Sequence, residues 1–427
     1  MTDRHPDNVL AVDTARQPFE RVLTPPGSKS LTNRALVLAA LSDGRSVLDG
    51  PLVSEDTIGL RDALARLGAT CEDDGDRWVI DGVAGRFPHG GAVDLGDGGT
   101  PARFMLAASA FASDRVVVDG SPRMRERPVA EGIELLRSLG VPITGTGTPE
   151  HLPATVDPWT ERAGGRVEVG RTASSQFISA LLLVAPWTRQ GITIDCTEAL
   201  TSETYIRLTL ATLRKAGARV TDGPTVEAGP LAAFESRIEP DASSAVYWWA
   251  AAAMIPGASV TVPIPSDSEQ PDMAALEILE AFGALVERAP HAVTVRGPAR
   301  LVGASVDAES CPDAAVMLAV VAASAEGPTR IDGLRTLRVK ETDRIHALAM
   351  ELGKTGCTVH EHPDAIEIDP STMHAGPIRV ATWNDHRMAM SFGILGLLRE
   401  GVSIEDPGCV AKSYPGFWAD RADLLDS

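Results

Sequence analysis

The chain has 427 residues, of which 44% are hydrophobic, and a formal net charge of -19. This length allows two hydrophobic cores, so we expect two lobes. The negative charge argues against a nucleic-acid or anionic-membrane surface, because phosphates bind clustered Lys and Arg. We find no signal-peptide pattern, no apolar stretch long enough for a bilayer, and no metal-ligand spacing among the five Cys. We therefore expect a cytoplasmic protein without a metal site.

An Ala-rich apolar run recurs six times along the chain, each time opened by a polar or charged tag and followed by Gly and a short β-type segment. The copies lie at 33–50, 100–120, 174–196, 242–263, 312–333 and 384–406. Spacing this regular indicates one supersecondary unit used six times. Each apolar run is long enough for a buried helix.

Between these copies lie amphipathic helix patterns that stop at Gly and lead into alternating strand residues, such as IELLRSLGVPITG. Each unit therefore predicts an α/β arrangement of helix, strand, helix and hairpin. Six units divide most simply into three plus three, with a midpoint near residue 240. The sixth unit runs out of strands, and we expect FERVLTPPG near the N-terminus to supply them. Both chain ends then lie in one lobe, with crossings near Thr24 to Gly27 and Glu239 to Asp241.

The first tag is PPGSKSLTNRA at 25–35, where Pro and Gly place Ser28 to Asn33 on a turn that enters a helix. Backbone N–H groups, Lys29, Ser30 and Arg34 can then face one anion at a helix N-terminus. A Ser or Asn cap with solvated charges explains the string equally well. A P-loop fits less well, because the earlier Gly of that motif is absent.

The second tag is GDGGTPARF at 96–104, followed by SPRMRERPV at 121–129. Its glycines permit close approach of the backbone to a ligand, although Gly-rich strings are usually plain turns. Positive charge comes from four arginines: Arg103, Arg123, Arg125 and Arg127. Four arginines within 25 residues of an acidic protein favour an anion site.

The third and fourth tags carry hydroxyl groups. TASSQF at 172–177, with SETYIRL at 202–208, suits phosphate or sugar hydroxyls, although helix capping is the simpler explanation. DASSA at 241–245 is interpreted as a cap and a lobe crossing only.

The fifth tag contains Asp313, and its unit leads into LRVKETDRIH at 337–346. We expect Lys340 and Arg344 on one face of a helix, at i and i+4, with Glu341 beside them. A solvated helix start would produce a similar string.

The sixth tag is WNDHRMAM at 383–390, with DPGCVAKSYP at 406–415. Here Arg387 and Lys412 add positive charge, and His386 alone fits a structural role better than that of a base. Independent caps would not each carry Arg, Lys or carboxylates, yet five of the six repeats do. If equivalent helix N-termini converge, they build one electropositive pocket for a multiply charged anion.

The motifs PPGSKSLTNRA, PRMRERP, SSQF, KETDR, NDHRMAM and DPxCxxK, in this order, resemble those of the 5-enolpyruvylshikimate-3-phosphate synthase family across essentially the whole chain. The resemblance implies two lobes, each of three βαβαββ units, with the active site in the cleft between them. Residues 1–24 and 241–427 would form the lobe with both termini and the catalytic carboxylates, and 25–240 the other.

The implied reaction transfers the enolpyruvyl group of phosphoenolpyruvate to the 5-hydroxyl of shikimate 3-phosphate and releases phosphate. It is a step of the shikimate pathway towards chorismate and the aromatic amino acids, and it needs no metal or organic cofactor. The resemblance further implies a monomer whose partners are these two small molecules.

The resemblance assigns shikimate 3-phosphate contacts to Lys29, Ser30, Arg34, Ser174, Ser175, Gln176, Ser202, Tyr205, Asp313 and Lys340. It assigns phosphoenolpyruvate contacts to Lys29, Gly99, Arg127, Gln176, Arg344, Arg387 and Lys412. We expect Asp313 to act as the base for the sugar hydroxyl. Glu341 would protonate C3 of the enolpyruvyl group and remove a proton again during elimination. Lys29 would stabilise charge and is a candidate proton carrier.

Two positions depart from the family pattern. Asp97 stands where the family usually has Asn in a GNAGT-like string, and Thr336 stands where Asn often precedes the VKETDR segment. These changes bear on substrate affinity and on the response to glyphosate-like inhibitors, and they leave the predicted reaction unchanged.

Two alternative functions remain open. A UDP-N-acetylglucosamine enolpyruvyl transferase is expected to carry Lys-Asn in place of Lys29 and Ser30, and a loop Cys that RMRERP lacks. A non-catalytic phosphate-ligand binding protein of the same fold is the other. An RNA 3'-phosphate cyclase is disfavoured by the acidity of the chain.

Overall fold

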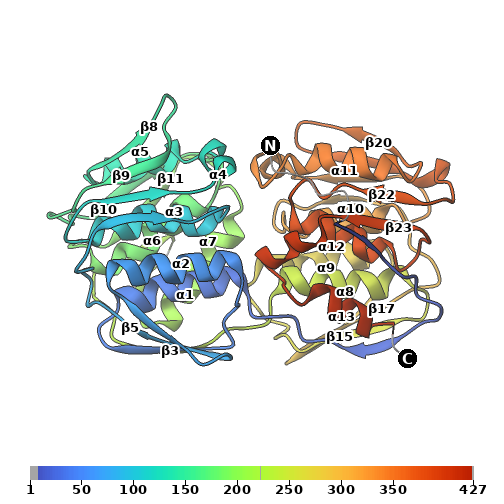
Figure 1. Ribbon diagram of the computed structural model, residues 1–427, viewed down its shortest axis with the longest axis horizontal. Coiled ribbons are helices and arrows are strands. Elements are labelled where there is room, and N and C mark those ends of the chain that lie inside the picture. The colour runs from blue at the N-terminus through green and yellow to red at the C-terminus, as the bar shows by residue number, and fades with distance from the viewer. Residues whose placement is uncertain (1–7, 222, 426–427) are drawn as a thin grey trace. The chain divides into compact units, whose positions relative to one another are not determined.

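The computed structural model describes residues 8–221 and 223–425, and the chain divides into two compact units (Figure 1). Unit 1 is Met1–Pro26 with Pro240–Ser427, and unit 2 is Gly27–Glu239. The sequence placed these boundaries two residues earlier at the first crossing and one residue later at the second. Within the described residues, no helix has both the length and the apolar character needed to cross a membrane.

Unit 2 consists of three βαβαββ repeats, each with a central helix, an outer helix and a four-stranded sheet. The central helices are α1 (Lys29–Leu41), α3 (Gly99–Ala108) and α6 (Gln176–Val184). The outer helices are α2 (Glu55–Leu67), α5 (Ala130–Ser138) and α7 (Glu203–Lys215). In sheet order, the strands are β14 (Glu235–Arg237), β3 (Arg45–Asp49), β5 (Arg77–Asp81), β4 (Thr70–Asp73); β6 (Gly91–Asp94), β7 (Val116–Asp119), β9 (His151–Val156), β8 (Ile143–Thr146); and β10 (Gly165–Val169), β11 (Ile192–Cys196), β13 (Thr225–Val226), β12 (Val220–Thr221).

Unit 1 repeats this plan. Its central helices are α8 (Ala242–Met254), α10 (Ala315–Ala322) and α12 (His386–Leu395), and its outer helices are α9 (Ala275–Ala281), α11 (Arg344–Gly353) and α13 (Phe417–Asp423). Its strands are β16 (Leu285–Ala289), β17 (Ala292–Arg296), β15 (Ser259–Val262), β2 (Glu20–Val22); β18 (Ser305–Asp307), β19 (Thr329–Asp332), β21 (Ile366–Asp369), β20 (Thr358–Glu361); and the three-stranded β1 (Val9–Ala11), β23 (Val402–Glu405), β22 (Ile378–Val380).

Among the described residues, each sheet has one parallel pair of strands, and in four of the six sheets a central helix connects the two strands of that pair along the chain. Strands β6 and β7, for example, are connected by α3 and pair in parallel, with Val93 opposite Val118. Alternate residues of β7, Val116 and Val118, are buried, as expected for a strand with one face on the core. The remaining pairs are antiparallel hairpins or their neighbours.

Two strands are exchanged between the units, and this explains the two crossings. Strand β2 directly precedes α1 in the sequence but pairs in parallel with β15 of unit 1. Strand β14 directly precedes α8 but pairs in parallel with β3 of unit 2. The expectation that FERVLTPPG completes the sixth repeat is therefore wrong. The sixth repeat is completed by β1, which pairs antiparallel with β23.

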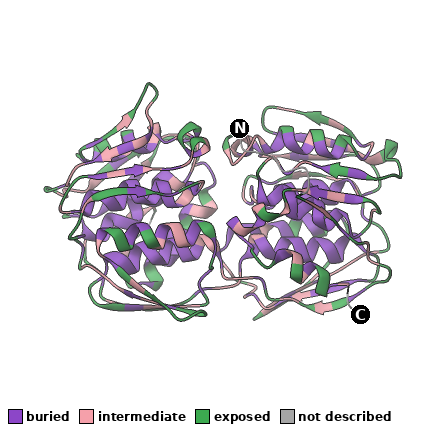
Figure 2. Cartoon of the chain, in the orientation of Figure 1, coloured by how far each residue is buried: buried purple, intermediate pink, exposed green. Residues whose placement is uncertain are grey.

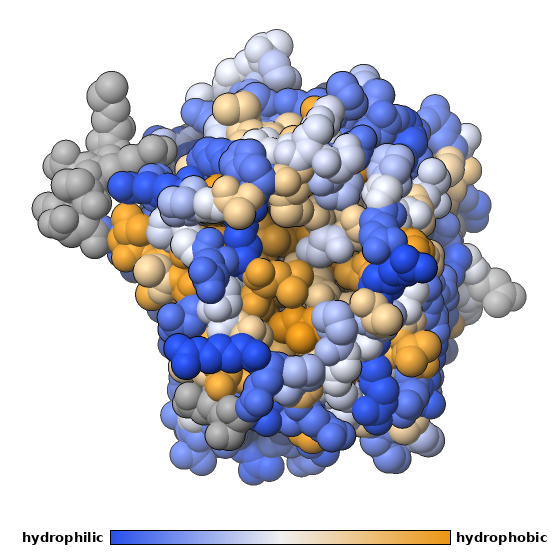
Figure 3. All heavy atoms as spheres, turned by 90° about the vertical axis from the view of Figure 1, so that its right-hand side faces the viewer, coloured by the Kyte–Doolittle hydropathy of each residue, from blue (hydrophilic) through white to orange (hydrophobic). Residues whose placement is uncertain are grey.

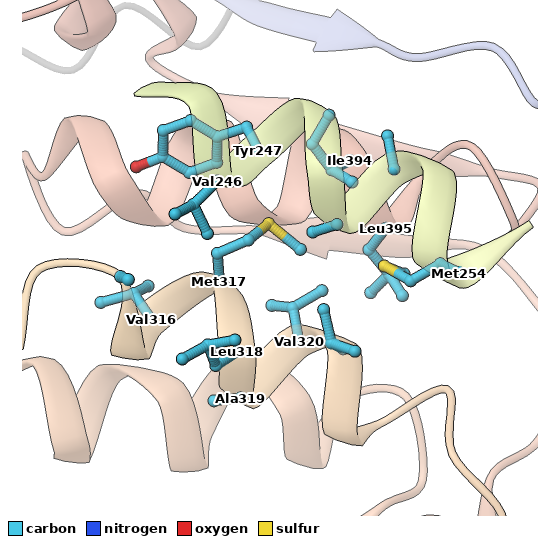
Figure 4. Close-up of a cluster of buried hydrophobic side chains, with 14 of the residues drawn as sticks. Val246, Tyr247, Met254, Val316, Met317, Leu318, Ala319, Val320, Ile394 and Leu395 are labelled. Carbon is cyan, nitrogen blue, oxygen red and sulfur yellow. The ribbon is translucent and has the colours of Figure 1, made fainter. Parts of the chain in front are cut away.

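The central helices are buried all round, unlike the outer helices (Figure 2). Their Ala-rich sequences allow this, because small side chains let three helices pack closely on one another. In unit 1, Val246 and Met254 of α8 pack with Met317 of α10 and with Ile394 and Leu395 of α12 (Figure 4). Every residue of α10 is buried. The polar tags are thereby left at the helix N-termini.

Candidate active site

In unit 1, the carboxylate of Asp313 accepts hydrogen bonds from three cations. Asp313 lies two residues before α10. Its Oδ1 lies 3.2 Å from Lys340 Nζ and 3.1 Å from Arg344 Nη1, and its Oδ2 lies 3.0 Å from Arg387 Nη2. Charge-assisted bonds of this kind fix the carboxylate in position. We call these residues, with Glu341, Asp385 and Lys412, the Asp313 cluster.

Glu341 is the second carboxylate of this cluster, and it shares Arg344 with Asp313. Arg344 Nη2 lies 2.9 Å from Glu341 Oε2, and Lys412 Nζ lies 3.2 Å from Glu341 Oε1. Lys412 ends the 3-10 helix η6 (Pro407–Lys412), which follows Asp406 in the left-handed backbone region, at φ 46°. The guanidinium group of Arg344 therefore lies between Asp313 and Glu341, the two carboxylates that we expected to act as base and acid.

Asp385 is the third carboxylate, and the sequence reasoning missed it although it quoted the NDHRMAM motif. Its side chain is fully buried and accepts from Arg344 Nε at 2.7 Å and from Arg344 Nη2 at 3.3 Å. It also accepts from the Arg387 backbone N–H at 2.8 Å, capping α12. Asp385 thus orients both Arg344 and the first turn of α12.

The segment from Lys340 to Arg344 is not the continuous helix that its spacing suggested. Lys340 follows the 3-10 helix η4 (Arg335–Val339), and α11 begins only at Arg344. Asp343 caps α11 by accepting from the His346 backbone N–H at 3.1 Å, which competes with helix at residues 341–343. Lys340, Glu341 and Arg344 still lie close together. Lys340 and Arg344 both contact Asp313, and Arg344 also contacts Glu341.

Burial and neighbouring charges shift the pKa values of the cationic groups of unit 1 in opposite directions. Burial lowers the pKa of Lys340, and the neighbouring Asp313 opposes that shift. Burial acts likewise on Arg344, but the carboxylates of Asp385, Glu341 and Asp313 together raise its pKa. Burial raises the pKa of Tyr247 to about 12; its hydroxyl lies 3.5 Å from Arg387 Nη1.

Asp272 is a further buried carboxyl group that the sequence did not single out. It is 1% exposed and accepts from the Ser243 hydroxyl, while its Oδ1 has no hydrogen-bond partner among the described residues. Burial, and then the charge of Asp313, raise its pKa to about 6. The fourth repeat, interpreted as a cap and crossing only, therefore adds Ser243 and Tyr247 to the surroundings of the Asp313 cluster.

In unit 2, Lys29 is the first residue of α1, after the cap Ser28. Its Nζ lies 3.2 Å from Asp56 Oδ2 on α2, a carboxylate that the sequence did not single out. The expected turn over residues 28–33 is therefore mostly the first turn of the helix itself. Lys29 and Ser30 are partly exposed at this helix start.

Arg34 lies beneath that first turn and is almost fully buried. Its Nε donates to Thr209 Oγ1 at 2.8 Å, its Nη1 to the Ser30 carbonyl at 3.0 Å, and its Nη2 to the Tyr205 carbonyl at 3.2 Å and Ser179 Oγ at 3.3 Å. Burial lowers its pKa to about 10. Arg34 thus connects α1 to α6 and α7 by hydrogen bonds, and its bond to the Ser30 carbonyl stabilises the start of α1.

Gln176 and Arg103 connect the N-terminal turns of α6 and α3. Arg103 Nη1 donates to Gln176 Oε1 at 2.7 Å, and Gln176 Nε2 donates to Thr100 Oγ1 at 2.9 Å. The guanidinium group of Arg103 also stacks over Phe177, 5.2 Å from the ring centroid. Two of the predicted helix starts are therefore joined in one hydrogen-bonded network.

Gly99 lies directly against Arg127. A Cβ atom at Gly99 would lie 2.7 Å from Arg127 Nη1, so only glycine lets this guanidinium group approach the helix start. Arg127 Nη1 lies 3.4 Å from the Asp97 carbonyl. The Asp97 carboxylate accepts from Ser121, the residue that caps α4 (Pro122–Glu126). Asp97, which stands where the family usually has Asn, thus holds the start of the arginine-rich segment 121–129.

Hydroxyl groups complete this side. Ser174 Oγ accepts from the Gln176 backbone N–H at 3.3 Å, and Ser175 directly precedes α6. Ser202 directly precedes α7 in the left-handed region, at φ 47°, and Tyr205 follows in the first turn. A non-glycine residue in this conformation is strained, which is typical of functional sites. We use the name Lys29 cluster for the predicted site residues of unit 2 together with Asp56 and Arg103. The predicted residues are Lys29, Ser30, Arg34, Gly99, Arg127, Ser174, Ser175, Gln176, Ser202 and Tyr205.

Two further observations bear on specificity and metals. Thr336, in η4, has its hydroxyl oxygen buried and without a hydrogen-bond partner in the described chain. Among the residues placed by the structure, no three His, Cys, Asp or Glu side chains are grouped as a metal site would require. The ionisable and polar side chains of the two clusters are Arg, Lys, Asp, Glu, Gln, Ser and Tyr.

The chain is similar to known proteins over nearly its whole length. Residues 14–420 match the family model described as EPSP synthase (3-phosphoshikimate 1-carboxyvinyltransferase). A 3-phosphoshikimate 1-carboxyvinyltransferase of Thiobacillus denitrificans is 39% identical over 93% of this chain and 95% of its own, and one of Methanosphaerula palustris is 37% identical over 94% and 96%. A solved EPSP synthase from Acinetobacter baumannii superposes with a TM-score of 0.80 at 25% identity, over 98% of each chain.

Proposed function

Because this chain belongs to the EPSP synthase (3-phosphoshikimate 1-carboxyvinyltransferase) family, we propose that it transfers the enolpyruvyl group of phosphoenolpyruvate to the 5-hydroxyl of shikimate 3-phosphate. It is a transferase of the shikimate pathway. The observation that carries the proposed mechanism is the pair of carboxylates, Asp313 and Glu341, held by the two ends of one buried guanidinium group, that of Arg344.

The proposed reaction has an addition step and an elimination step. In the addition, Asp313 accepts the proton of the 5-hydroxyl while the oxygen attacks C2 of phosphoenolpyruvate, and protonated Glu341 donates a proton to C3. In the elimination, Glu341 takes a proton from the new methyl group, the double bond re-forms, and the C–O bond to phosphate breaks. The proton on Asp313 leaves with the released phosphate.

The cations of the two clusters bind the substrates in this proposal. Shikimate 3-phosphate contacts the Ser, Gln, Tyr and Lys residues assigned to it, and Arg34 supports the start of α1. Phosphoenolpyruvate contacts Lys29, Gly99, Arg127, Gln176, Arg344, Arg387 and Lys412. Two phosphates and two carboxylates require several Arg and Lys, which supports this assignment. Lys29 stabilises the charge that develops in the intermediate.

We further propose a cytoplasmic monomer that acts on these two small molecules without a metal or organic cofactor. The net charge of -19 supports the absence of nucleic-acid and anionic-membrane partners. Local cation clusters, rather than the overall charge, then provide the affinity for anionic substrates.

A product assay tests the function directly. The purified chain is incubated with phosphoenolpyruvate and either shikimate 3-phosphate or UDP-N-acetylglucosamine, and phosphate release and the enolpyruvyl product are measured. We expect release only with shikimate 3-phosphate. Release only with the nucleotide sugar would identify the sister activity, and tight binding without release would identify a binding protein.

A further inference from the structure

An internal repeat outside the proposed active site distinguishes the two units. The segment DPWTERAG at 157–164 precedes β10 in the third repeat, and DPSTMHAG at 369–376 precedes β22 in the sixth. Both segments cover the ends of the central helices that are opposite the polar tags. The shared Asp, Pro, Thr, Ala and Gly show that they are copies of one element. Two of the positions at which the copies differ matter here. Trp159 corresponds to Ser371, and Arg162 corresponds to His374.

In unit 2, aromatic rings and a guanidinium group close these helix ends. Trp159 is buried and packs edge-on against Phe111, with ring centroids 6.0 Å apart. Arg162 stacks over the same ring at 4.8 Å and donates to the Gly85 carbonyl at 2.9 Å. Trp187, after α6, lies so close to Gly85 that a Cβ there would be 2.5 Å from the indole ring.

Among the described residues that line the corresponding helix ends of unit 1, none is Phe, Trp or Tyr. The end of α10 continues as Ala323, Ser324 and Ala325, and α12 is followed by Leu398, which is 42% exposed. A hollow with a volume of about 1060 Å³ lies here, lined by these residues, by Leu395 and by the segment 370–377. Figure 3 shows hydrophobic atoms gathered in the centre of one face of unit 1, with hydrophilic atoms around them. A pocket of this size and lining is typical of small-molecule sites.

The helix ends at the hollow favour a cation over an anion. Helices α10 and α12 end at it, and a helix C-terminus carries a partial negative charge. Of the two acidic groups at the rim, Glu326 is paired with Arg300 at 3.2 Å, and the other is Glu400. Of the two basic groups there, Arg399 donates to the Gly376 carbonyl at 2.9 Å and His374 lies 3.3 Å from the Ala375 carbonyl. In unit 2, the cation Arg162 occupies the corresponding place.

We propose that the hollow of unit 1 binds a small aromatic amine. Its ring takes the place that Trp159 fills in unit 2, and its ammonium group takes the place of the Arg162 guanidinium group. Ring burial against Ala323, Leu395 and Leu398 supplies the affinity, and the carbonyl ends of α10 and α12 select the positive charge. This site is separate from the Asp313 cluster, which lies before the opposite, N-terminal ends of the same helices.

Ligand-observed NMR and calorimetry with tryptamine test this proposal on the full chain. We expect saturable binding of tryptamine, and binding of indole-3-propionate, which has the same ring and the opposite charge, at least about tenfold weaker. Ser371→Trp restores the residue that the third repeat carries, and we expect it to remove tryptamine binding. Ser138→Trp, an exposed serine on α5, is the matched control and should bind like the wild type.

Three results would overturn the proposal. One is the absence of saturable tryptamine binding to the wild type. Another is equal binding by Ser371→Trp, provided that its thermal unfolding shows a folded protein. The third comes from sedimentation velocity: a wild-type dimer that Ser371→Trp converts to a monomer would make the hollow an interface between copies of this chain.

Discussion

Two buried arginines, one in each unit, have opposite pKa shifts. Arg34 and Arg344 are each 1% exposed. Arg34 donates to hydroxyl and carbonyl oxygens, and burial lowers its pKa to about 10. Burial also acts on Arg344, but three carboxylates around it raise its pKa. The comparison shows that neutral oxygens hold the buried arginine of unit 2, whereas the buried arginine of unit 1 holds carboxylates.

This difference assigns different tasks to the two units. In unit 2, Arg34 and Arg103 organise the helix starts through bonds to neutral oxygens, and Lys29 lies beside Asp56 at one of these starts. In unit 1, Asp313 and Glu341 are fixed by cations, as proton transfer requires. We therefore expect changes in unit 1 to lower kcat and changes in unit 2 to raise KM.

The largest expected effect comes from the two carboxylates of unit 1. Asp313→Asn and Glu341→Gln should each lower kcat by about 10²- to 10⁴-fold, because each removes a proton-transfer group and keeps its shape. Steady-state kinetics for both substrates would measure this. Glu361→Gln, an exposed carboxylate of the same unit, is the control and should leave kcat unchanged. Near-normal turnover of either cluster variant would refute its assigned role.

The next effect concerns stability. Asp385→Asn should lower the free energy of unfolding by about 3 to 5 kcal/mol, because it removes a carboxylate from the buried Arg344. Asp369→Asn is a matched control, since Asp369 also accepts from a backbone N–H two residues later but lies nearer the surface. Urea unfolding should show a loss of about 1 kcal/mol there. Equal losses would mean that Arg344 does not depend on Asp385.

A smaller effect should appear in the pH dependence of stability. The folded-state pKa of Asp272 is about 6, against an ordinary value of 3.8. The folded state therefore binds this proton more tightly, and stability falls as the pH rises between these values, by on the order of 2 to 3 kcal/mol. Asp272→Asn should remove this fall, so the variant gains stability relative to the wild type between pH 4 and pH 7. Parallel stability profiles of the two proteins would exclude this role.

The smallest effect tests the close approach in unit 2. Gly99→Ala places a methyl group against Arg127 and displaces the end of a flexible side chain. We expect KM for phosphoenolpyruvate to rise by about three- to tenfold with kcat nearly unchanged, as for the loss of one hydrogen bond. Gly59→Ala on α2, where a Cβ meets nothing within 4 Å, should leave KM unchanged. A change in kcat instead of KM at Gly99 would contradict the division of tasks.

Much of the fold could be predicted because its signals are local. Tags, apolar runs and glycine stops recur in each repeat, so the central and outer helices follow from the sequence. The repeat that β2 joins could not be predicted: the sequence assigned FERVLTPPG to the sixth repeat, whereas β2 pairs with β15 of the fourth, and only long-range pairing separates the two positions. Local pattern carries no information on which of two similar sheets a strand joins.

The candidate site divides in the same way. Asp313, Glu341 and Lys412 lie in recognisable motifs, and the structure brings them together. Asp385 lies in such a motif too, but its importance comes from burial beside Arg344, which the sequence does not show. Asp272 and Asp56 lie in no distinctive pattern. Packing alone placed them beside Ser243 and Lys29.

The central claim is that Glu341 transfers the proton at C3, and deuterium incorporation tests it most directly. The wild type and Glu341→Gln are incubated with both substrates in deuterium oxide, and C3 of the enolpyruvyl group is analysed by mass spectrometry. Binding of both substrates to the variant is checked separately. The account predicts deuterium at C3 with the wild type and incorporation at least about 100-fold slower with Glu341→Gln. Incorporation at the wild-type rate by Glu341→Gln would contradict it.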